Sequence, residues 1–291
     1  MSPFSVLFVC VTFIFMACGT HEPQSSNTKI PQISSKASTE SIIDTSGTQL
    51  KTRVLPPTGF IRPSVEVTSF AAYLRNLPLK SHGSPVHLFN GNLKGRQDVH
   101  TAVFDVDIGS RDLQQCADAV MRLRAEYLWQ KKAYDQIQFN FTNGFPATYS
   151  RWRSGERIRV TGSSVSWYDT GGPTTSYESF RKYLTMVFSY AGTLSLEKEL
   201  TPVSVNEIRI GDVFIQGGSP GHAVLVVDQA VHPQTGEKLV LLAQSYMPAQ
   251  DIHVLVNPLR EDVTPWFALS DMTDAVLTPE WRFLPQDLRR F

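Results

Sequence analysis

Apolar residues recur along the chain with two periods, and each period predicts one type of secondary structure. Strict alternation over residues 99–108 predicts a strand, whereas apolar positions three and four apart over residues 112–132 predict a helix of about five turns. A short helix is expected over residues 69–79, and a second long helix is expected from residue 176 until Gly192 ends it.

Three segments near the C-terminus have the apolar, β-branched composition of buried strands. They cover residues 211–218, 222–228 and 238–248. The last two are separated by "HPQTGEK", a turn sequence rich in Pro and Gly, which predicts a hairpin. Because helices come first and antiparallel strands come last, the pattern favours the α+β fold class.

The N-terminus carries an apolar run from Phe4 to Ala17 that stops at Cys18. This run is shorter than the about 20 residues that cross a bilayer, so residues 1–17 are predicted to be a signal peptide, with a transmembrane anchor as the alternative. The ending "FMAC" resembles a bacterial lipobox, which implies lipidation of Cys18. We therefore expect an exported lipoprotein of the bacterial cell envelope, anchored to the membrane on its periplasmic or surface side.

Composition changes after this signal and again near residue 53. Residues 18–52 are rich in Ser and Thr, which predicts a disordered tether, and residues 53–291 are predicted to form a single globular domain. The chain has 27 basic and 27 acidic side chains, and this balance argues against a nucleic-acid partner. No cofactor is expected.

Four residues upstream of the first long helix have the chemistry of metal ligands, but no metal site is predicted. These residues are His87, His100, Asp105 and Asp107. Alternation along the strand places His100 on the face opposite to the two aspartates, so the four cannot share one ion.

The motif "GGSPG" at residues 217–221 has the form of a serine-hydrolase elbow, which makes Ser219 a candidate nucleophile. Its context argues against this role, because Pro220 lacks the N–H that the oxyanion hole needs and a strand follows instead of a helix. Cleavage before Cys18 would remove Cys10, and lipidation would use Cys18. Cys116 is then the one free thiol, which is either buried or used.

Cys116, His222 and Gln244 have the order of a nucleophile, a general base and a residue that orients the base. With Asp112 as the expected N-cap and Gln115 at capping-box spacing, the helix dipole would favour a Cys116 thiolate. His222 opens one predicted strand and Gln244 ends the next, so a hairpin could join them. Packing of Cys116 on the apolar helix face is the structural alternative.

The segments "GHAVLVVD" and "KLVLLAQSYMP" are similar to the His and Asn strands of papain-like cysteine peptidases, and "GDVFIQGGSPGHAVLVV" resembles the histidine strand of cell-wall peptidases of the NlpC/P60 and CHAP type. The resemblance implies a papain-like (NlpC/P60-like) arrangement, with an N-terminal helix-borne Cys and a C-terminal antiparallel sheet. It also implies that Cys116 is the nucleophile, His222 the base and Gln244 the orienting residue.

Over a longer stretch, from Phe60 to the C-terminus, the chain resembles an uncharacterised bacterial family called domain of unknown function 4846. The similarity runs through "DLQQCADAVMRLRAEYL", "NFTNG" and "GDVFIQGGSPGHAVLVVD". This family implies a lipoprotein-like context but no settled activity.

Together these observations favour a cysteine hydrolase or amidase that acts on peptide-containing cell-envelope material. The alternative is a non-catalytic lipoprotein that binds a glycan or peptide in the same cleft. Polar residues in turn-rich or strand-end positions are the expected binding groups: Asn143, Arg151, Ser219 and Ser245.

Overall fold

The computed structural model describes residues 41–291. The predicted signal peptide, Cys18 and the tether as far as residue 40 lie outside the described residues. Residues 41–52 are predicted above as tether, but they are part of the fold. Leu50 is fully buried and Ile43 pairs with Val54 as an isolated β-bridge, so the predicted boundary at residue 53 is too late.

The described residues combine helices and strands. The helices are α1 (Leu50–Arg53), α2 (Phe70–Arg75), α3 (Cys116–Gln130), α4 (Tyr149–Ser154), α5 (Tyr177–Tyr190) and α6 (Thr193–Glu199). The strands are β1 (His100–Val103), β2 (Gln138–Asn140), β3 (Pro146–Thr148), β4 (Glu156–Thr161), β5 (Ser164–Asp169), β6 (Thr201–Pro202), β7 (Val213–Gln216), β8 (His222–Val231), β9 (Lys238–Gln244), β10 (His253–Leu255), β11 (Phe267–Ala268), β12 (Val276–Leu277), β13 (Arg282–Phe283) and β14 (Leu288–Arg290).

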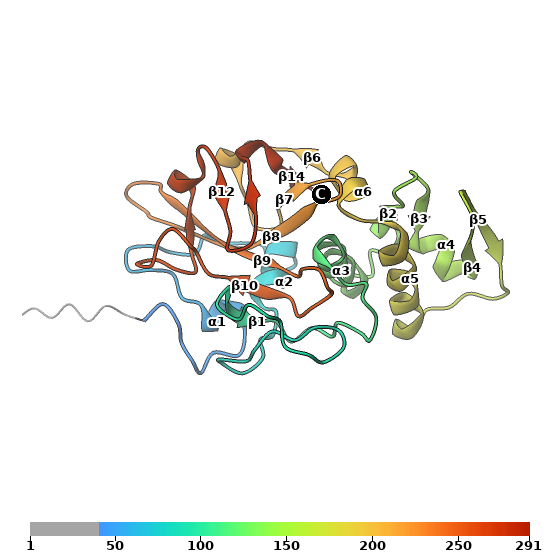
Figure 1. The fold of residues 1–291 in the computed structure, drawn as a ribbon, viewed down its shortest axis with the longest axis horizontal. Coiled ribbons are helices and arrows are strands. Elements are labelled where there is room, and N and C mark those ends of the chain that lie inside the picture. Colours follow the sequence, from blue (N-terminus) through green and yellow to red (C-terminus); the bar gives the residue numbers. More distant parts are fainter. Residues whose placement is uncertain (1–40) are drawn as a thin grey trace, which may run out of the picture. The chain divides into compact units, whose positions relative to one another are not determined.

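One eight-stranded antiparallel sheet organises the described residues, which all belong to one unit (Figure 1). Its strands follow the order β1-β10-β9-β8-β7-β14-β6, and β11 pairs with β9. The predicted hairpin is present, because β8 pairs with β9 through residues such as Leu225 and Ala243. Short two-stranded sheets are formed by β2–β3, β4–β5 and β12–β13.

Both faces of the central strands are buried, which explains their nearly continuous apolar sequence. On β8, Ala223, Leu225 and Val227 face the cluster that contains α3, whereas Val224 and Val226 face a second cluster built by the C-terminal segment. Burying each Val or Leu side chain contributes roughly 1.5–3 kcal/mol. This burial therefore stabilises the packing of α3 onto β8.

Most of the elements expected from periodicity are confirmed, including α2, α3, α5 and the strands β7, β8 and β9. The start of α3 differs from the prediction. Gln115, not Asp112, is its N-cap, so Cys116 is the first residue of the helix. Asp112 instead accepts hydrogen bonds from the Gln115 side chain at 2.9 Å and from the backbone N–H of Ala249 at 2.6 Å.

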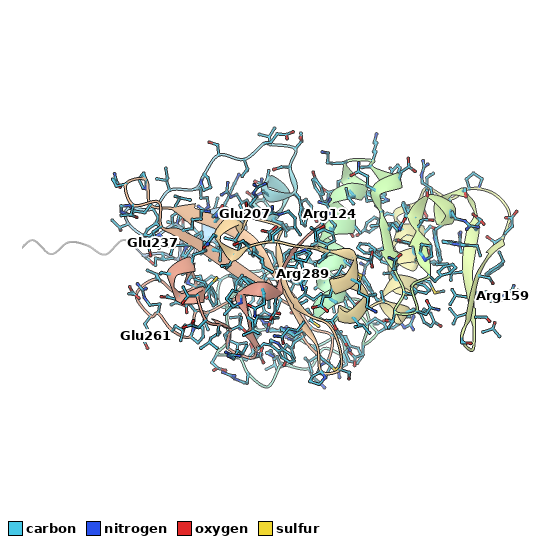
Figure 2. All side chains as sticks on the ribbon, turned by 90° about the horizontal axis from the view of Figure 1, so that it is seen from above. Arg124, Arg159, Glu207, Glu237, Glu261 and Arg289 are labelled. Atoms are coloured by element: carbon cyan, nitrogen blue, oxygen red, sulfur yellow. The ribbon has the colours of Figure 1, made fainter. Side chains whose placement is uncertain are left out.

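Charged side chains of both signs lie at separate places on the surface (Figure 2). Glu237 and Glu261 are exposed on turns, and Arg159 is exposed on the β4–β5 hairpin, where its guanidinium stacks on Tyr168 at 4.4 Å. Acidic and basic side chains are thus distributed over several elements of the fold.

The glycines before β8 let this loop pack closely against α6. A Cβ on Gly221 would lie 2.6 Å from the carbonyl oxygen of Gly218 and 2.8 Å from that of Gln216. It would also meet the hydroxyl of Thr193 in α6. Gly221 is therefore needed for packing at the strand end that carries His222.

Gly221→Ala is expected to lower the free energy of unfolding by about 1–3 kcal/mol, because the new methyl group overpacks a site bounded by backbone atoms. Urea unfolding measures this change. Gly95→Ala is the matched control, since no atom lies within 4 Å of the added Cβ. Equal unfolding midpoints for the two variants would contradict the packing role of Gly221.

Candidate active site

A cavity of about 820 Å³ lies where the start of α3, the loop before β8 and the start of α6 meet. Cys116 and His222 both line it, together with Ser219, Thr193 and Trp281. The structure therefore brings the predicted nucleophile and the predicted base to one cavity although 106 positions separate them in the sequence.

Cys116 occupies the first position of α3, and its side chain is partly buried. The backbone N–H groups of Ala117 and Ala223 are near enough to lower the pKa of its thiol. Ala223 directly follows His222 on β8, so the sulfur lies against the first turn of its own helix and the start of the strand that carries the histidine. The packing of α3 on β8 produces this placement.

His222 is the first residue of β8 and only 2% exposed. Its Nε2 lies 2.8 Å from Oε1 of Gln244, at the end of the neighbouring strand β9. The rings of Tyr246, Trp281 and Phe283 surround the imidazole at centroid distances of 4.8, 5.2 and 5.9 Å. The predicted pairing of His222 with Gln244 is present, and aromatic packing fixes the plane of the ring.

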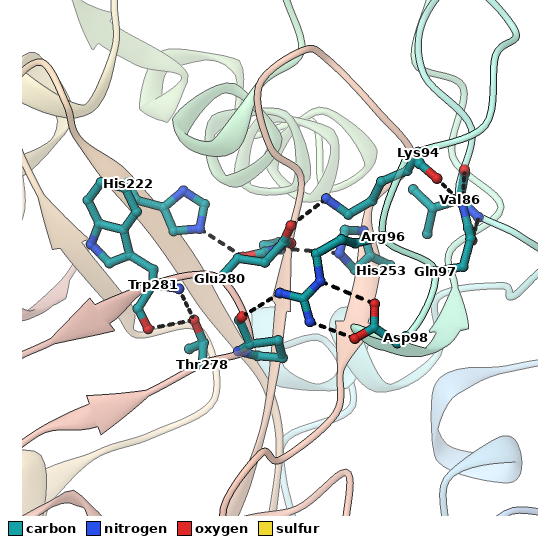
Figure 3. Close-up of polar contacts among 12 residues, drawn as sticks. Val86, Lys94, Arg96, Gln97, Asp98, His222, His253, Thr278, Glu280 and Trp281 are labelled. Atoms are coloured by element: carbon teal, nitrogen blue, oxygen red, sulfur yellow. Dashed lines mark hydrogen bonds and ion pairs between the residues drawn. The ribbon is translucent and has the colours of Figure 1, made fainter.

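Gln244 is held in turn by groups that the sequence did not suggest, among them Glu280 and His253, which are labelled near His222 in Figure 3. Its amide nitrogen donates to Oε2 of Glu280 at 2.8 Å and lies 3.4 Å from Nε2 of His253. Lys94 binds the other oxygen of Glu280 at 2.7 Å. These residues come from a loop near residue 94, from β10 and from the C-terminal segment, and no local sequence pattern connects them.

Burial dominates the electrostatics of Cys116 and His222. Burial, followed by the charge of Asp118, raises the pKa of the Cys116 thiol to about 11, against the opposing effect of the backbone N–H groups. Burial lowers the pKa of His222 to about 4, although the hydrogen bond between its ring and the Gln244 side chain opposes this shift. Near neutral pH both groups are therefore uncharged.

The predicted thiolate is wrong for this resting state. The helix N-terminus favours a thiolate as expected, but desolvation and the nearby Asp118 carboxyl outweigh that effect. A neutral thiol and a neutral imidazole remain chemically competent, because an imidazole within hydrogen-bond reach can accept the proton while the sulfur attacks.

The structure places the four predicted binding residues in different surroundings. Ser219 is exposed and lines the cavity. Ser245 is fully buried, and its hydroxyl lies 2.9 Å from each of the carbonyl oxygens of Gln114 and Gln250. Ser245 therefore connects the backbones of two neighbouring segments, and it does not line the cavity.

Asn143 and Arg151 are also absent from the cavity wall. Asn143 is exposed and accepts the backbone N–H of Phe145 at 3.0 Å, so it stabilises a turn. The guanidinium of Arg151 binds Glu156 at 2.7 Å and stacks on Trp167 at 4.7 Å. Local pairing satisfies both side chains, which a sequence pattern cannot reveal.

Residues 41–291 contain neither a metal-binding cluster nor a membrane-spanning helix. Within this range, no cluster of three or more His, Cys, Asp or Glu side chains is arranged to hold a metal ion. No helix in the described part of the chain is long and apolar enough to span a membrane.

Comparison with known proteins places the chain in a family. The family model described as "Domain of unknown function (4846)" matches residues 50–290. The chain belongs to this family. Cys116, His222, Gln244 and Glu280 all lie within the matched region of this domain of unknown function 4846.

The large ribosomal subunit protein uL16 of Tetrahymena thermophila is 29% identical over 87 residues. This similarity covers 30% of the present chain and 40% of the ribosomal protein, so the chain spans less than half of that protein's length. No solved structure matches the chain.

In this domain of unknown function 4846, alkylation of Cys116 by iodoacetamide is expected to accelerate about tenfold per pH unit between pH 7 and 10, because a pKa of about 11 leaves little thiolate. Peptide mass spectrometry locates the modification at Cys116 in the full-length chain. The urea-unfolded chain is the control, and its Cys116 should react roughly 10² times faster at pH 7. A rate plateau below pH 8 in the folded chain would show a thiolate and contradict the neutral pair.

Proposed function

We propose that this protein is a cysteine hydrolase of the peptidase or amidase type. The observation that carries the proposal is that Cys116 and His222 line one cavity while His222 is hydrogen-bonded to Gln244. The proposed nucleophile and the proposed base thus share one cavity, and the proposed orienting group lies on the strand next to the base.

We further propose that the arrangement is papain-like. The nucleophile begins a helix that packs on an antiparallel sheet, and the base and its orienting residue lie on adjacent strands of that sheet. The hydrogen bond from Nε2 of His222 to a side-chain amide supports this proposal, because it leaves Nδ1 as the nitrogen available to the thiol.

In the proposed reaction, His222 accepts the thiol proton as the sulfur of Cys116 attacks an acyl carbon. The backbone N–H groups of Ala117 and Ala223, which lower the pKa of the thiol, stabilise the charge that develops on the sulfur. The C–N bond then breaks as the imidazolium returns the proton to the leaving amine. Water, deprotonated by His222, hydrolyses the thioester and restores the thiol.

The substrate proposal rests on the N-terminal sequence. An export signal and a lipidated Cys18 would hold the domain in the bacterial cell envelope, where amide bonds of peptide-containing envelope material are the available targets. The lipid at Cys18 is the proposed membrane contact. No nucleic-acid partner is proposed, since the charges balance.

A second candidate function is non-catalytic binding of a glycan or peptide in the same cavity. The neutral, buried state of both Cys116 and His222 favours this alternative, because strongly activated thiols have lowered pKa values. The exposed Ser219, Leu194 and Met247 at the cavity would then contact the ligand.

Cys116→Ala is expected to abolish cleavage of peptidoglycan fragments by the full-length protein, and His222→Ala should lower kcat by roughly 10²–10⁴, because each removes one of the two reacting groups. Mass spectrometry of the released peptides measures the rate. His82→Ala is the control, since His82 is exposed and outside the cavity. Wild-type rates in Cys116→Ala would refute the proposal. Binding of fragments without cleavage by the wild type would favour the second function.

A further inference from the structure

The contacts of Gln244 determine which nitrogen of His222 carries a proton. An amide side chain has one donating end and one accepting end, and only its neighbours decide how the two are placed. Oε1 of Gln244 lies 2.8 Å from Nε2 of His222, and its amide nitrogen lies 2.8 Å from Oε2 of Glu280. The orientation of this amide therefore links Glu280 to His222.

Glu280 is compatible with only one orientation of the Gln244 amide. An ionised carboxylate has no proton to donate, so it must face the amide NH₂ group. Glu280 forms an ion pair with Lys94, and the pair is nearly buried, with side-chain exposures of 8% for Lys94 and 11% for Glu280. Turning the amide round would bring its oxygen against the carboxylate and leave the buried acceptors of Glu280 and His253 without a donor.

His253 independently requires the same orientation. Its Nδ1 lies 2.9 Å from the carbonyl oxygen of Asp251, which can only accept, so this nitrogen carries the proton. Nε2 of His253 is then an acceptor, and it lies 3.4 Å from the amide nitrogen of Gln244. Two acceptors from different elements thus face the same end of the amide (Figure 3).

We propose that Lys94, Glu280 and His253 are positioning residues that fix the Gln244 amide and thereby hold His222 as the Nε2–H tautomer. Because Oε1 of Gln244 can only accept, Nε2 of His222 must donate. The lone pair then resides on Nδ1, which has no hydrogen-bond partner among residues 41–291.

The catalytic use of this tautomer rests on the proposed function, but the tautomer itself does not. In the hydrolase scheme, Nδ1 must accept the thiol proton, and the opposite tautomer could not do so. Glu280 and Lys94 touch neither the thiol nor the substrate in this scheme, so they set the tautomer through Gln244.

The tautomer is tested by two-bond ¹⁵N–¹H correlation spectra of the full-length protein labelled with ¹⁵N-histidine at pH 7. Absence of the resonances in His222→Ala assigns the ring of His222. The proposal expects a protonated Nε2 and an unprotonated Nδ1. A protonated Nδ1 in the wild type would overturn it.

Glu280→Gln supplies the second measurement. The new side chain can donate to Gln244, so the Gln244 amide is free to turn and present its NH₂ group to His222. The Nδ1–H form of His222 is then expected to appear. Asp287→Asn is the matched control, because Asp287 also accepts a glutamine amide, that of Gln216 at 2.7 Å, without contacting Gln244. The same tautomer change in both variants would show general loosening of the C-terminal segment and contradict the specific role of Glu280.

Kinetics separate this proposal from the hydrolase proposal. If fragments are cleaved, Glu280→Gln should lower kcat by roughly 10²–10⁴ with little change in KM, as expected for a wrong tautomer. An Nε2–H tautomer in a protein that cleaves no substrate would leave the positioning role intact and refute the hydrolase. An active Glu280→Gln variant with a normal kcat would refute the positioning role alone.

Discussion

The packing of α3 on β8 is the constraint on which the candidate site depends. It buries apolar side chains from both elements, and it brings the first residue of the helix to the first residue of the strand. The β8–β9 hairpin then adds Gln244 beside His222. Three residues distant in the sequence therefore meet because two structural elements share a core, and the close-packed loop at Gly221 maintains the geometry at the strand end.

The same burial that assembles the site controls its chemistry. Removal of water raises the pKa of the thiol and lowers the pKa of the imidazole, so neither group is charged near neutral pH. The charged Lys94–Glu280 pair is linked to His222 through the side chain of Gln244. We infer that this pair fixes the orientation of the Gln244 amide next to the histidine. We also infer that proton transfer accompanies attack by the sulfur in the proposed reaction, since no preformed thiolate is present.

Local patterns in the sequence predict the elements that carry the site, but long-range contacts determine its details. Periodicity identifies α3, β8 and β9, and hairpin pairing is sufficient to suggest Gln244 as the partner of His222. Glu280 could not be found in this way, because it follows Gln244 by 36 residues and no pattern links the two. The sign of the Cys116 pKa shift also depends on three-dimensional burial, which outweighs the helix dipole.

The central claim is that Cys116 forms a covalent acyl intermediate with the help of His222. Rapid acid quenching of the full-length protein with peptidoglycan fragments, followed by peptide mass spectrometry, tests it most directly. A peptide acyl group is expected on Cys116 during turnover; it should disappear when the substrate is exhausted and should not form in His222→Ala. Cleavage products without any acyl group on Cys116 would contradict it.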